Sequence, residues 1–275
     1  MNKYYIFAKI FIALNLLHRM IMELQHLILT RFNIQYEIKS DDGIKPQWLE
    51  NRCKLFETYC LPSLQKQTCQ NYIWIIFADK RTPEPYVKRL ENYQHTLSQL
   101  RIQWTSFYED YNVLYQEIGQ KYANGYNKLL TSRIDNDDAF ATTYVEKVQQ
   151  IALGGHEGTI SFPIGRQTFL DNHKSYQIKY VENHFLSRIE TKEFHTILGF
   201  DHREAKKHNL LIIKTEQPMW EEIVHDNNIA NQYVPSFMHK ITSFSDFTDI
   251  AHRYLLVQKK RTHKVFNMVF KKNKT

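Results

Sequence analysis

Short apolar runs alternate with longer amphipathic stretches between residues 26 and 152. The runs have strand length, and the stretches between them repeat apolar residues at helical spacing. The predicted strands are 26–34, 72–79, 102–107 and 129–134, and the predicted helices are 46–62, 86–100, 111–124 and 142–152. This alternation predicts βαβ units, and therefore a parallel sheet with right-handed crossovers.

The segment from Pro46 shows the helical signal clearly. Proline suits the first turn of a helix, and Pro62 is expected to end this one. One face of the predicted helix is formed by Leu49, Cys53, Phe56 and Cys60. In contrast, residues 72–79 are continuously apolar up to Asp79, which predicts a strand that is buried on both faces.

The composition is that of a folded protein. The chain has 275 residues, of which 43% are hydrophobic, and contains 17 Tyr and 17 Phe. This is enough apolar material for one large domain or two closely packed halves, and it excludes a disordered chain. Cys53, Cys60 and Cys69 lack the spacing of metal ligands. They fit buried thiols in a reducing compartment better than a disulfide framework.

The net charge of +7 is concentrated at the C-terminus. Residues 250–275 contain eight Lys and Arg and no Asp or Glu, which leaves residues 1–249 with a net charge of about −1. A fold that binds nucleic acid carries its positive charge on its body, so we expect no nucleic acid partner. Apolar residues between the lysines of this basic amphipathic tail suit an anionic membrane surface, and a solvated basic terminus is the alternative.

The N-terminal segment is apolar but short. Residues 4–17 fall below the roughly 20 residues that span a bilayer, and no small-residue cleavage site follows them. We expect no transmembrane span. Residues 1–22 are interpreted as an apolar leader that lies at an interface, or as an upstream extension ahead of a start at Met20 or Met22.

Polar side chains follow three of the predicted strands. Asn33 and Asp79 stand at the ends of the first two, and Asp135 and Asp137 follow residues 129–134. Ligands of open α/β sheets bind outside the carboxyl ends of the strands. We therefore expect these side chains to line one crevice, which favours a nucleotide-diphosphate site.

The sequence Asp-Asn-Asp-Asp at 135–138 places three carboxylates within four residues. Like charges this close repel one another, and a divalent cation with hard oxygen ligands, Mg²⁺ or Mn²⁺, relieves the repulsion. In an extended strand Asp135 and Asp137 would share a face and could hold one ion, which would in turn bind a diphosphate. An acidic turn that caps the next helix is the alternative.

Several segments resemble the N-terminal half of GT-A glycosyltransferases. More narrowly, the chain is similar to a bacterial family called the putative rhamnosyl transferases, over about residues 23–235. Thr131 to Ala139 looks like the DXD metal motif in an extended D-x-D-D form. The other matching segments are Thr30-Arg31-Phe32-Asn33, Trp48 to Thr68, Trp74 to Asp79, Phe162-Pro163-Ile164-Gly165, Phe185-Leu186-Ser187-Arg188-Ile189-Glu190, Met219-Trp220 and Val224-His225-Asp226-Asn227-Asn228.

The resemblance implies a GT-A-like, Rossmann-related α/β domain with a mixed, mostly parallel central sheet flanked by helices. Residues 23–160 would form the half that binds the nucleotide-sugar, and residues 161–249 the half that binds the acceptor. The implied reaction is transfer of a sugar, such as rhamnose, from a nucleotide-diphosphate donor to a glycan or lipid-linked acceptor in bacterial surface polysaccharide synthesis. The implied location is cytoplasmic, with peripheral attachment to the inner face of the membrane.

The resemblance also assigns roles to single residues. Asn33 and Asp79 would line the pocket for the base and ribose. Asp135 would contact the ribose and, with Asp137 and His225, would bind Mn²⁺ or Mg²⁺. A partly buried helix histidine is the alternative for His225, and the other twelve histidines are assigned to the surface or the core.

Two neighbours of this set have competing interpretations. Arg133 would contact the pyrophosphate, or it forms an ion pair with a nearby Asp. Asp138 is the weaker ligand candidate, because it could equally cap the following helix.

An inverting glycosyltransferase needs a general base to take the proton of the acceptor hydroxyl. Glu190 is the candidate, because the family has a glutamate there, and a surface glutamate is the alternative. A retaining enzyme would not use a base in this way, and the residues leave the stereochemistry open.

Three other functions were weighed. A nucleotidyltransferase usually has a glycine-rich loop after its first strand, whereas residues 31–34 contain no glycine. A haloacid-dehalogenase-like phosphatase wants Thr or Val shortly after its D-x-D, where this chain has Asp138-Ala139. A nucleic-acid-binding module would use the basic tail, against which the nearly neutral body argues.

Overall fold

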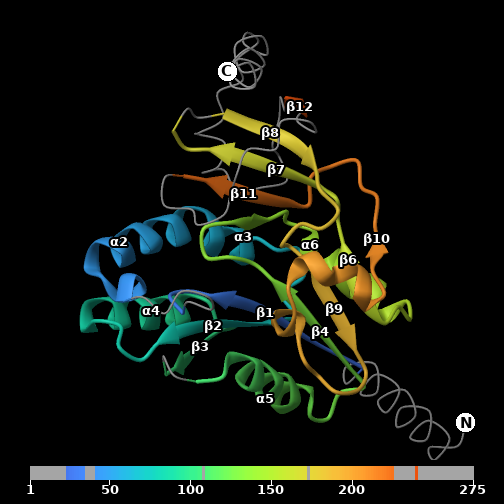
Figure 1. Cartoon of the computed structure of the whole chain (residues 1–275), viewed down its shortest axis with the longest axis horizontal. Helices are drawn as coiled ribbons and strands as arrows, with labels where there is room; N and C mark the ends of the chain where they lie inside the picture. The colour runs from blue at the N-terminus through green and yellow to red at the C-terminus, as the bar shows by residue number, and fades with distance from the viewer. Residues whose placement is uncertain (1–22, 35–40, 107–108, 172–173, 226–238, 241–275) are drawn as a thin grey trace, which may run out of the picture.

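The computed structural model describes residues 23–34, 41–106, 109–171, 174–225 and 239–240 (Figure 1). The predictions for the leader at 1–22 and the tail at 250–275 fall outside this part of the chain. Within the described ranges, no helix is both long enough and apolar enough to cross a membrane.

In the part of the chain that the structure describes, the strands form two sheets. The first has seven strands in the order β10-β6-β9-β4-β1-β2-β3, and the second has five in the order β12-β8-β7-β11-β5. The strands of the first sheet are β1 Leu24–Arg31, β2 Ile73–Asp79, β3 Leu100–Thr105, β4 Lys128–Arg133, β6 Gly158–Ser161, β9 Ser187–Glu190 and β10 Leu211–Ile212. Those of the second are β5 Ala139–Phe140, β7 Ile164–Phe169, β8 Lys174–Lys179, β11 Trp220–Val224 and β12 His239–Lys240.

The first sheet is mixed and mostly parallel. β1 pairs in parallel with both β2 and β4, β2 pairs in parallel with β3, and β9 runs antiparallel between β4 and β6. This confirms the predicted class, an α/β fold with a mixed, mostly parallel central sheet. Each sheet contains strands from both of the predicted halves, 23–160 and 161–249. β9 and β10 of the second half belong to the first sheet, and β5 of the first half belongs to the second sheet.

Helices cover both faces of the first sheet (Figure 1). The α-helices are α2 Pro46–Leu55, α3 Leu61–Gln65, α4 Glu84–Thr96, α5 Tyr111–Ala123 and α6 Tyr144–Leu153. Short 3-10 turns are η1 Asp41–Ile44, η3 Ile197–Gly199 and η4 His202–His208, and η2 Phe56–Cys60 is a π-helical segment. Pro46 occupies the first turn of α2, as predicted.

The alternation of side chains along β2 explains the two cores. Trp74 and Ile76 face the core that contains α2, α4 and α6. Ile75 and Phe77 face the second core, which contains α5. All four side chains are buried, so the prediction of a strand covered on both faces is confirmed.

Pro62 does not end the helix that begins at Pro46, contrary to the prediction. Helical structure continues to Gln65 through the π-helical segment and α3, where Pro62 occupies the first turn. Pro62 lies just after the π-helical segment, in which the backbone already departs from the i to i−4 hydrogen-bond pattern that proline interrupts. Phe56, the first residue of the π-helical segment, packs in the core against Trp74 and Tyr93.

A chain of buried polar groups links β1, β4 and β9. The imidazole of His26 contacts Ser132 Oγ through Nε2 at 2.9 Å and the amide nitrogen of Gln149 through Nδ1 at 3.1 Å. Because an amide nitrogen only donates, Nδ1 accepts, and Nε2 carries the proton. Ser132 in turn contacts Ser187 Oγ at 2.6 Å. Burial lowers the pKa of His26 to about 3, so this network is built around a neutral imidazole.

We therefore expect the free energy of unfolding to fall as the pH is lowered from about 6.5 towards 3. The unfolded chain takes up the proton near pH 6.5 and the folded protein only near 3, so acid favours the unfolded state over that window. The contribution of His26 is at most about 1.4 kcal/mol per pH unit. Urea unfolding of the wild type and of His26→Gln at several pH values measures it. Equal pH slopes for the two proteins would contradict the assignment.

Candidate functional site

The chain leaves β4 at Arg133 and makes a tight turn, in which the N–H of Asp138 donates to the carbonyl of Asp135 at 3.3 Å. The extended conformation expected for residues 135–137 therefore does not form, and Asp135 and Asp137 do not share a strand face. The turn lies at the carboxyl ends of the parallel strands β1 and β4, which is the edge where ligands of such sheets bind.

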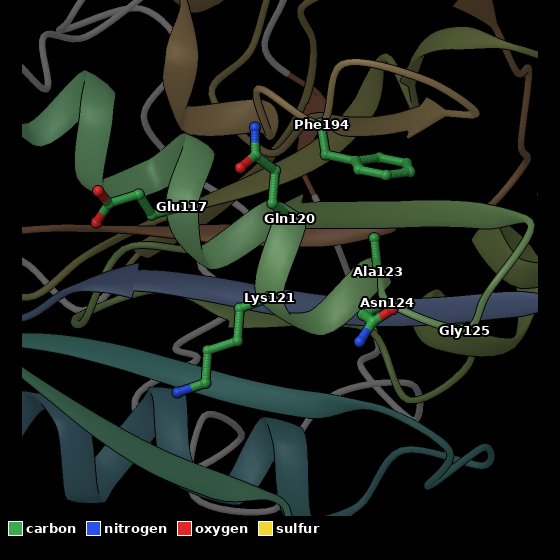
Figure 2. A pocket seen from close by; sticks show the side chains of 7 residues that line it. All are labelled: Glu117, Gln120, Lys121, Ala123, Asn124, Gly125 and Phe194. Carbon is green, nitrogen blue, oxygen red and sulfur yellow. The ribbon is translucent and has the colours of Figure 1, made fainter.

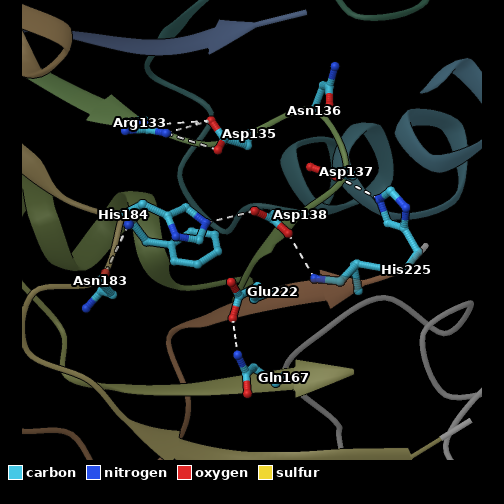
Figure 3. Close-up of polar contacts among 12 residues, drawn as sticks. Arg133, Asp135, Asn136, Asp137, Asp138, Gln167, Asn183, His184, Glu222 and His225 are labelled. Atoms are coloured by element: carbon cyan, nitrogen blue, oxygen red, sulfur yellow. Dashed lines mark hydrogen bonds and ion pairs between the residues drawn. The ribbon is translucent and has the colours of Figure 1, made fainter. Parts of the chain in front are cut away.

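The turn brings Asp135 and Asp138 together with His184, a residue that follows β8. One ligand atom from each of the three lies within 4.8 Å of the others. His184 Nε2 is 3.0 Å from Asp138 Oδ2 (Figure 3). Neighbouring ligands of an ion with bonds of about 2.1 Å and octahedral geometry lie about 3 Å apart. Two carboxylates and an imidazole are a donor set suited to Mn²⁺ or a similar divalent ion.

Packing fixes the imidazole of His184. Its ring lies 4.1 Å from that of Phe185, which stacks on Trp220 with centroids 4.6 Å apart. Trp220 lies directly over Gly165 on β7, where a Cβ atom would come within 2.2 Å of the indole. The glycine is therefore required for this stack, which holds the imidazole beside Asp138.

The charges around the acidic turn favour the binding of a cation. Burial raises the pKa of Asp138 well above its ordinary value, and the charges of Asp137, Asp135 and Glu222 raise it further. Burial also opposes ionisation of Asp135, but the charges of Arg133, His184 and Arg31 hold its pKa below the ordinary value. Asp138 is thus the carboxylate whose ionised form the surroundings disfavour most, and the positive charge of a bound divalent ion would favour that form. The donor set and this charge both fit a metal.

Asp137 has different partners. Its Oδ2 accepts hydrogen bonds from Arg52 at 2.5 Å and from His225 at 2.9 Å. Burial opposes its ionisation, but the hydrogen bond from His225 and the charge of Arg52 lower its pKa. The structure thus brings Asp137 and His225 together as predicted, beside Asp135 and Asp138 rather than in one ligand group with them (Figure 3).

Asn33 and Asp79 meet at the ends of β1 and β2. The Asn33 side chain accepts from the N–H of Asp79 and donates to Gly43 O and Thr82 Oγ1. The Asp79 carboxylate accepts from the guanidinium of Arg81 at 2.7 Å. Both side chains are buried, so they shape the loops at this edge of the sheet. Arg133 contacts Asp135 at 3.1 Å, which is the ion pair weighed as its alternative role.

Glu190 lies apart from this group. It pairs in register with Leu129, near the amino end of β4, whereas Asp135 follows the carboxyl end. Its carboxylate accepts from the N–H groups of His195 and Thr196 and from Arg188. Burial raises the pKa of Glu190, which these contacts partly offset. The structure does not bring Glu190 to the other predicted site residues, and its role as base stays a prediction.

A hollow of about 710 Å³, whose lining residues are drawn in Figure 2, lies at the same end of β4 as Glu190. It is lined by the last turns of α5 and by Phe194, next to the turn that Glu190 holds. Asn124 and Gly125, which also line it, precede β4 in the chain, so the hollow lies at the amino end of that strand. Ligands of parallel sheets bind at the carboxyl ends, so the acidic turn is the candidate site.

Comparison with known proteins now decides the family. The profile of a family described as "putative rhamnosyl transferase" matches residues 25–236. This range covers most of the chain and contains every residue of the site described above. The chain belongs to this family. The resemblance to this family seen in the sequence is thus confirmed. No curated protein matches the chain.

Solved structures give distant matches. The crystal structure of S. aureus TarS 1–349 in complex with UDP is 11% identical, with a TM-score of 0.38, and the match covers 74% of this chain and 61% of that one. A putative nucleotide-diphospho-sugar transferase from Desulfovibrio desulfuricans G20 is 12% identical, with a TM-score of 0.35, over 74% of this chain and 82% of that one. This chain thus spans about three-fifths of the length of the TarS fragment.

Sequence reasoning missed His184 and Glu222. His184 was left among the surface or core histidines, although it directly precedes the matching segment at 185–190, and it meets Asp138 only through the fold, 46 positions away. A signal existed for Glu222, which lies between two segments quoted for the resemblance, at 219–220 and 224–228.

Proposed function

We propose that this protein is a glycosyltransferase that moves a sugar from a nucleoside-diphosphate donor to a hydroxyl of a glycan or lipid-linked acceptor. Rhamnose is the sugar that the family description names. The observation that carries the proposal is the group of Asp135, Asp138 and His184 at the carboxyl ends of β1 and β4. A diphosphate needs positive charge to bind and to leave, and this group is built to hold a cation.

In this proposal Asp135, Asp138 and His184 would hold Mn²⁺ or Mg²⁺, which when bound would stabilise the charge that develops on the leaving diphosphate. Arg133 lies beside Asp135 and would turn to the diphosphate on donor binding. Asn33 and Asp79 hold the loops that border the base and ribose at the neighbouring strand ends. Asp137, with Arg52 and His225, fixes the acidic turn from behind.

The proposed acceptor follows from the resemblance noted in the sequence and from the chemistry of the reaction. A growing surface glycan or its lipid-linked precursor offers the free hydroxyl that the reaction needs. The predicted attachment of the basic tail to an anionic membrane would bring the protein to such an acceptor.

The test is release of nucleoside diphosphate from a panel of nucleotide sugars that includes dTDP-rhamnose, with Mn²⁺ or with EDTA. We expect one donor to be turned over, and only with the metal. A parallel assay supplies nucleoside triphosphates and sugar 1-phosphates and measures pyrophosphate. Pyrophosphate release without turnover of any nucleotide sugar would replace the proposal with a nucleotidyltransferase.

A further inference from the structure

Glu222 faces the acidic turn from the second sheet. β11 pairs antiparallel with β5, with Trp220 opposite Phe140 and Glu221 opposite Ala139, so Glu222 comes opposite Asp138. The backbone confirms this position, because the N–H of Ile223 donates to Asp138 Oδ1 at 2.9 Å. Figure 3 shows Glu222 between Asp138 and Gln167.

The two neighbouring glutamates of β11 have opposite environments. Glu221 is fully buried in an ion pair with Arg166, which neutralises it. Glu222 lies on the other face of the strand and retains 8% of its surface exposed. Its hydrogen bond comes from a neutral group, the amide nitrogen of Gln167, at 2.5 Å. Glu222 is therefore a carboxylate with a neutral hydrogen-bond donor, beside Asp138 of the candidate site.

The side-chain amide of Gln167 is oriented so that it hydrogen-bonds Glu222, at the expense of its own oxygen atom. Its amide nitrogen must face the carboxylate, because only that end donates. Its Oε1 is then buried without a hydrogen-bond partner among the described residues. A buried, unsatisfied acceptor costs about 1–3 kcal/mol. A role in orienting Glu222 accounts for a glutamine with one unsatisfied end at this position.

We propose that Glu222 is the general base of the transfer reaction and that Gln167 positions it; this inference rests on the proposed function. The acceptor O–H bond breaks and its proton goes to the Glu222 carboxylate, as the oxygen forms a bond to the anomeric carbon. The bond from that carbon to the diphosphate oxygen breaks, and the electron pair leaves with the nucleoside diphosphate. Attack opposite to departure inverts the anomeric centre.

Two other assignments fit the structure less well. Glu222 lies outside the three-residue ligand group, so a metal held there leaves its carboxylate free to accept a proton. Glu190, the base predicted from the sequence, accepts two backbone hydrogen bonds at the far end of β4. Of these two glutamates, Glu222 is the one that faces the acidic turn.

The experiment compares Glu222→Gln with the wild type in hydrolysis of dTDP-rhamnose, or of whichever nucleotide sugar the wild type turns over, with Mn²⁺ present. Water needs a base to attack, so we expect a loss of at least about 100-fold in kcat. Azide is an anionic nucleophile with no proton to lose. We therefore expect azide to restore turnover in the variant and to yield the glycosyl azide with inverted configuration.

Binding measurements separate this role from others. Mn²⁺ and nucleoside diphosphate should bind Glu222→Gln as tightly as the wild type, and loss of Mn²⁺ binding would overturn the base role in favour of a metal ligand. Unchanged hydrolysis, or a rate that azide does not restore, would also overturn it. Glu216→Gln, the same change at an exposed glutamate, is the control. A wild type that turns over no nucleotide sugar would overturn the proposed function and this inference with it.

Discussion

Replacing Asp138 with asparagine is expected to remove metal-dependent turnover while leaving the protein folded. The substitution takes away one oxygen ligand from the group with Asp135 and His184. A metal that stabilises the leaving diphosphate contributes several kcal/mol, so we expect kcat to fall by about a thousandfold or more. Turnover of the donor with saturating Mn²⁺, measured beside that of the wild type, gives the effect.

The fold should tolerate this change. Burial and the neighbouring carboxylates raise the pKa of Asp138, so its ionised form destabilises the metal-free protein. Asparagine is neutral and retains an oxygen for the N–H of Ile223. We therefore expect the metal-free variant to unfold at the same temperature as the wild type or above it. A large fall in melting temperature would show that Asp138 has a structural role instead.

Matched variants distinguish the two possible ligand sets. Asp137→Asn and His225→Gln change the residues that the sequence assigned to the metal, and Asp138→Asn and His184→Gln change those that the structure brings together. Mn²⁺ affinity should fall strongly in the second pair and little in the first. The reverse result would restore Asp137 and His225 as the ligands.

Replacing Arg52 with methionine is expected to lower the free energy of unfolding by about 3–5 kcal/mol. The change removes the cation of a buried ion pair and leaves the charge of Asp137 poorly compensated. The guanidinium joins α2 to the acidic turn through Asn136 as well, and it lies over the ring of Trp48 at 5.0 Å. Urea unfolding at neutral pH measures the loss. Most of the expected loss is the cost of burying the carboxylate of Asp137 without its cation, rather than the net stabilisation that the ion pair contributes.

A double-mutant cycle tests this reason. Asp137→Asn removes the stranded charge, so the Arg52→Met, Asp137→Asn double variant should be more stable than the sum of the two single losses implies. We expect a coupling of about 1–3 kcal/mol, the upper part of the range for residues in contact. Additive losses would show that Arg52 acts through packing on Trp48.

The sequence predicted the parts of the fold that local patterns determine. Apolar runs and helical periodicity located β1, β2, β4 and their helices, because the sheet buries those residues on both faces. The end of the helix at Pro62 was wrong, since a π-helical segment moves that proline into a first turn. A bulge of this kind depends on packing around Phe56, which periodicity does not reveal.

The candidate site was predicted in place but not in detail. Asp135 and its neighbours lie at a strand end, as the pattern indicated. Which carboxylate joins Asp135 depends on the turn at 135–138, and which histidine joins them depends on contacts between segments 46 or more positions apart. Glu222 faces Asp138 because of the pairing of β11 with β5, and pairing in a second sheet cannot be deduced from periodicity alone.

The most direct test of the account is thermal unfolding with a panel of nucleoside diphosphates, each with and without Mn²⁺. A ligand at 100 times its Kd stabilises the folded protein by about 2.7 kcal/mol, which should raise the Tm of a chain this size by about 5–10 °C. We expect this for one nucleotide, only with Mn²⁺, and not in Asp138→Asn. No shift with any nucleotide, or a shift that persists without Mn²⁺ and in Asp138→Asn, would contradict a metal-dependent nucleotide site at this turn.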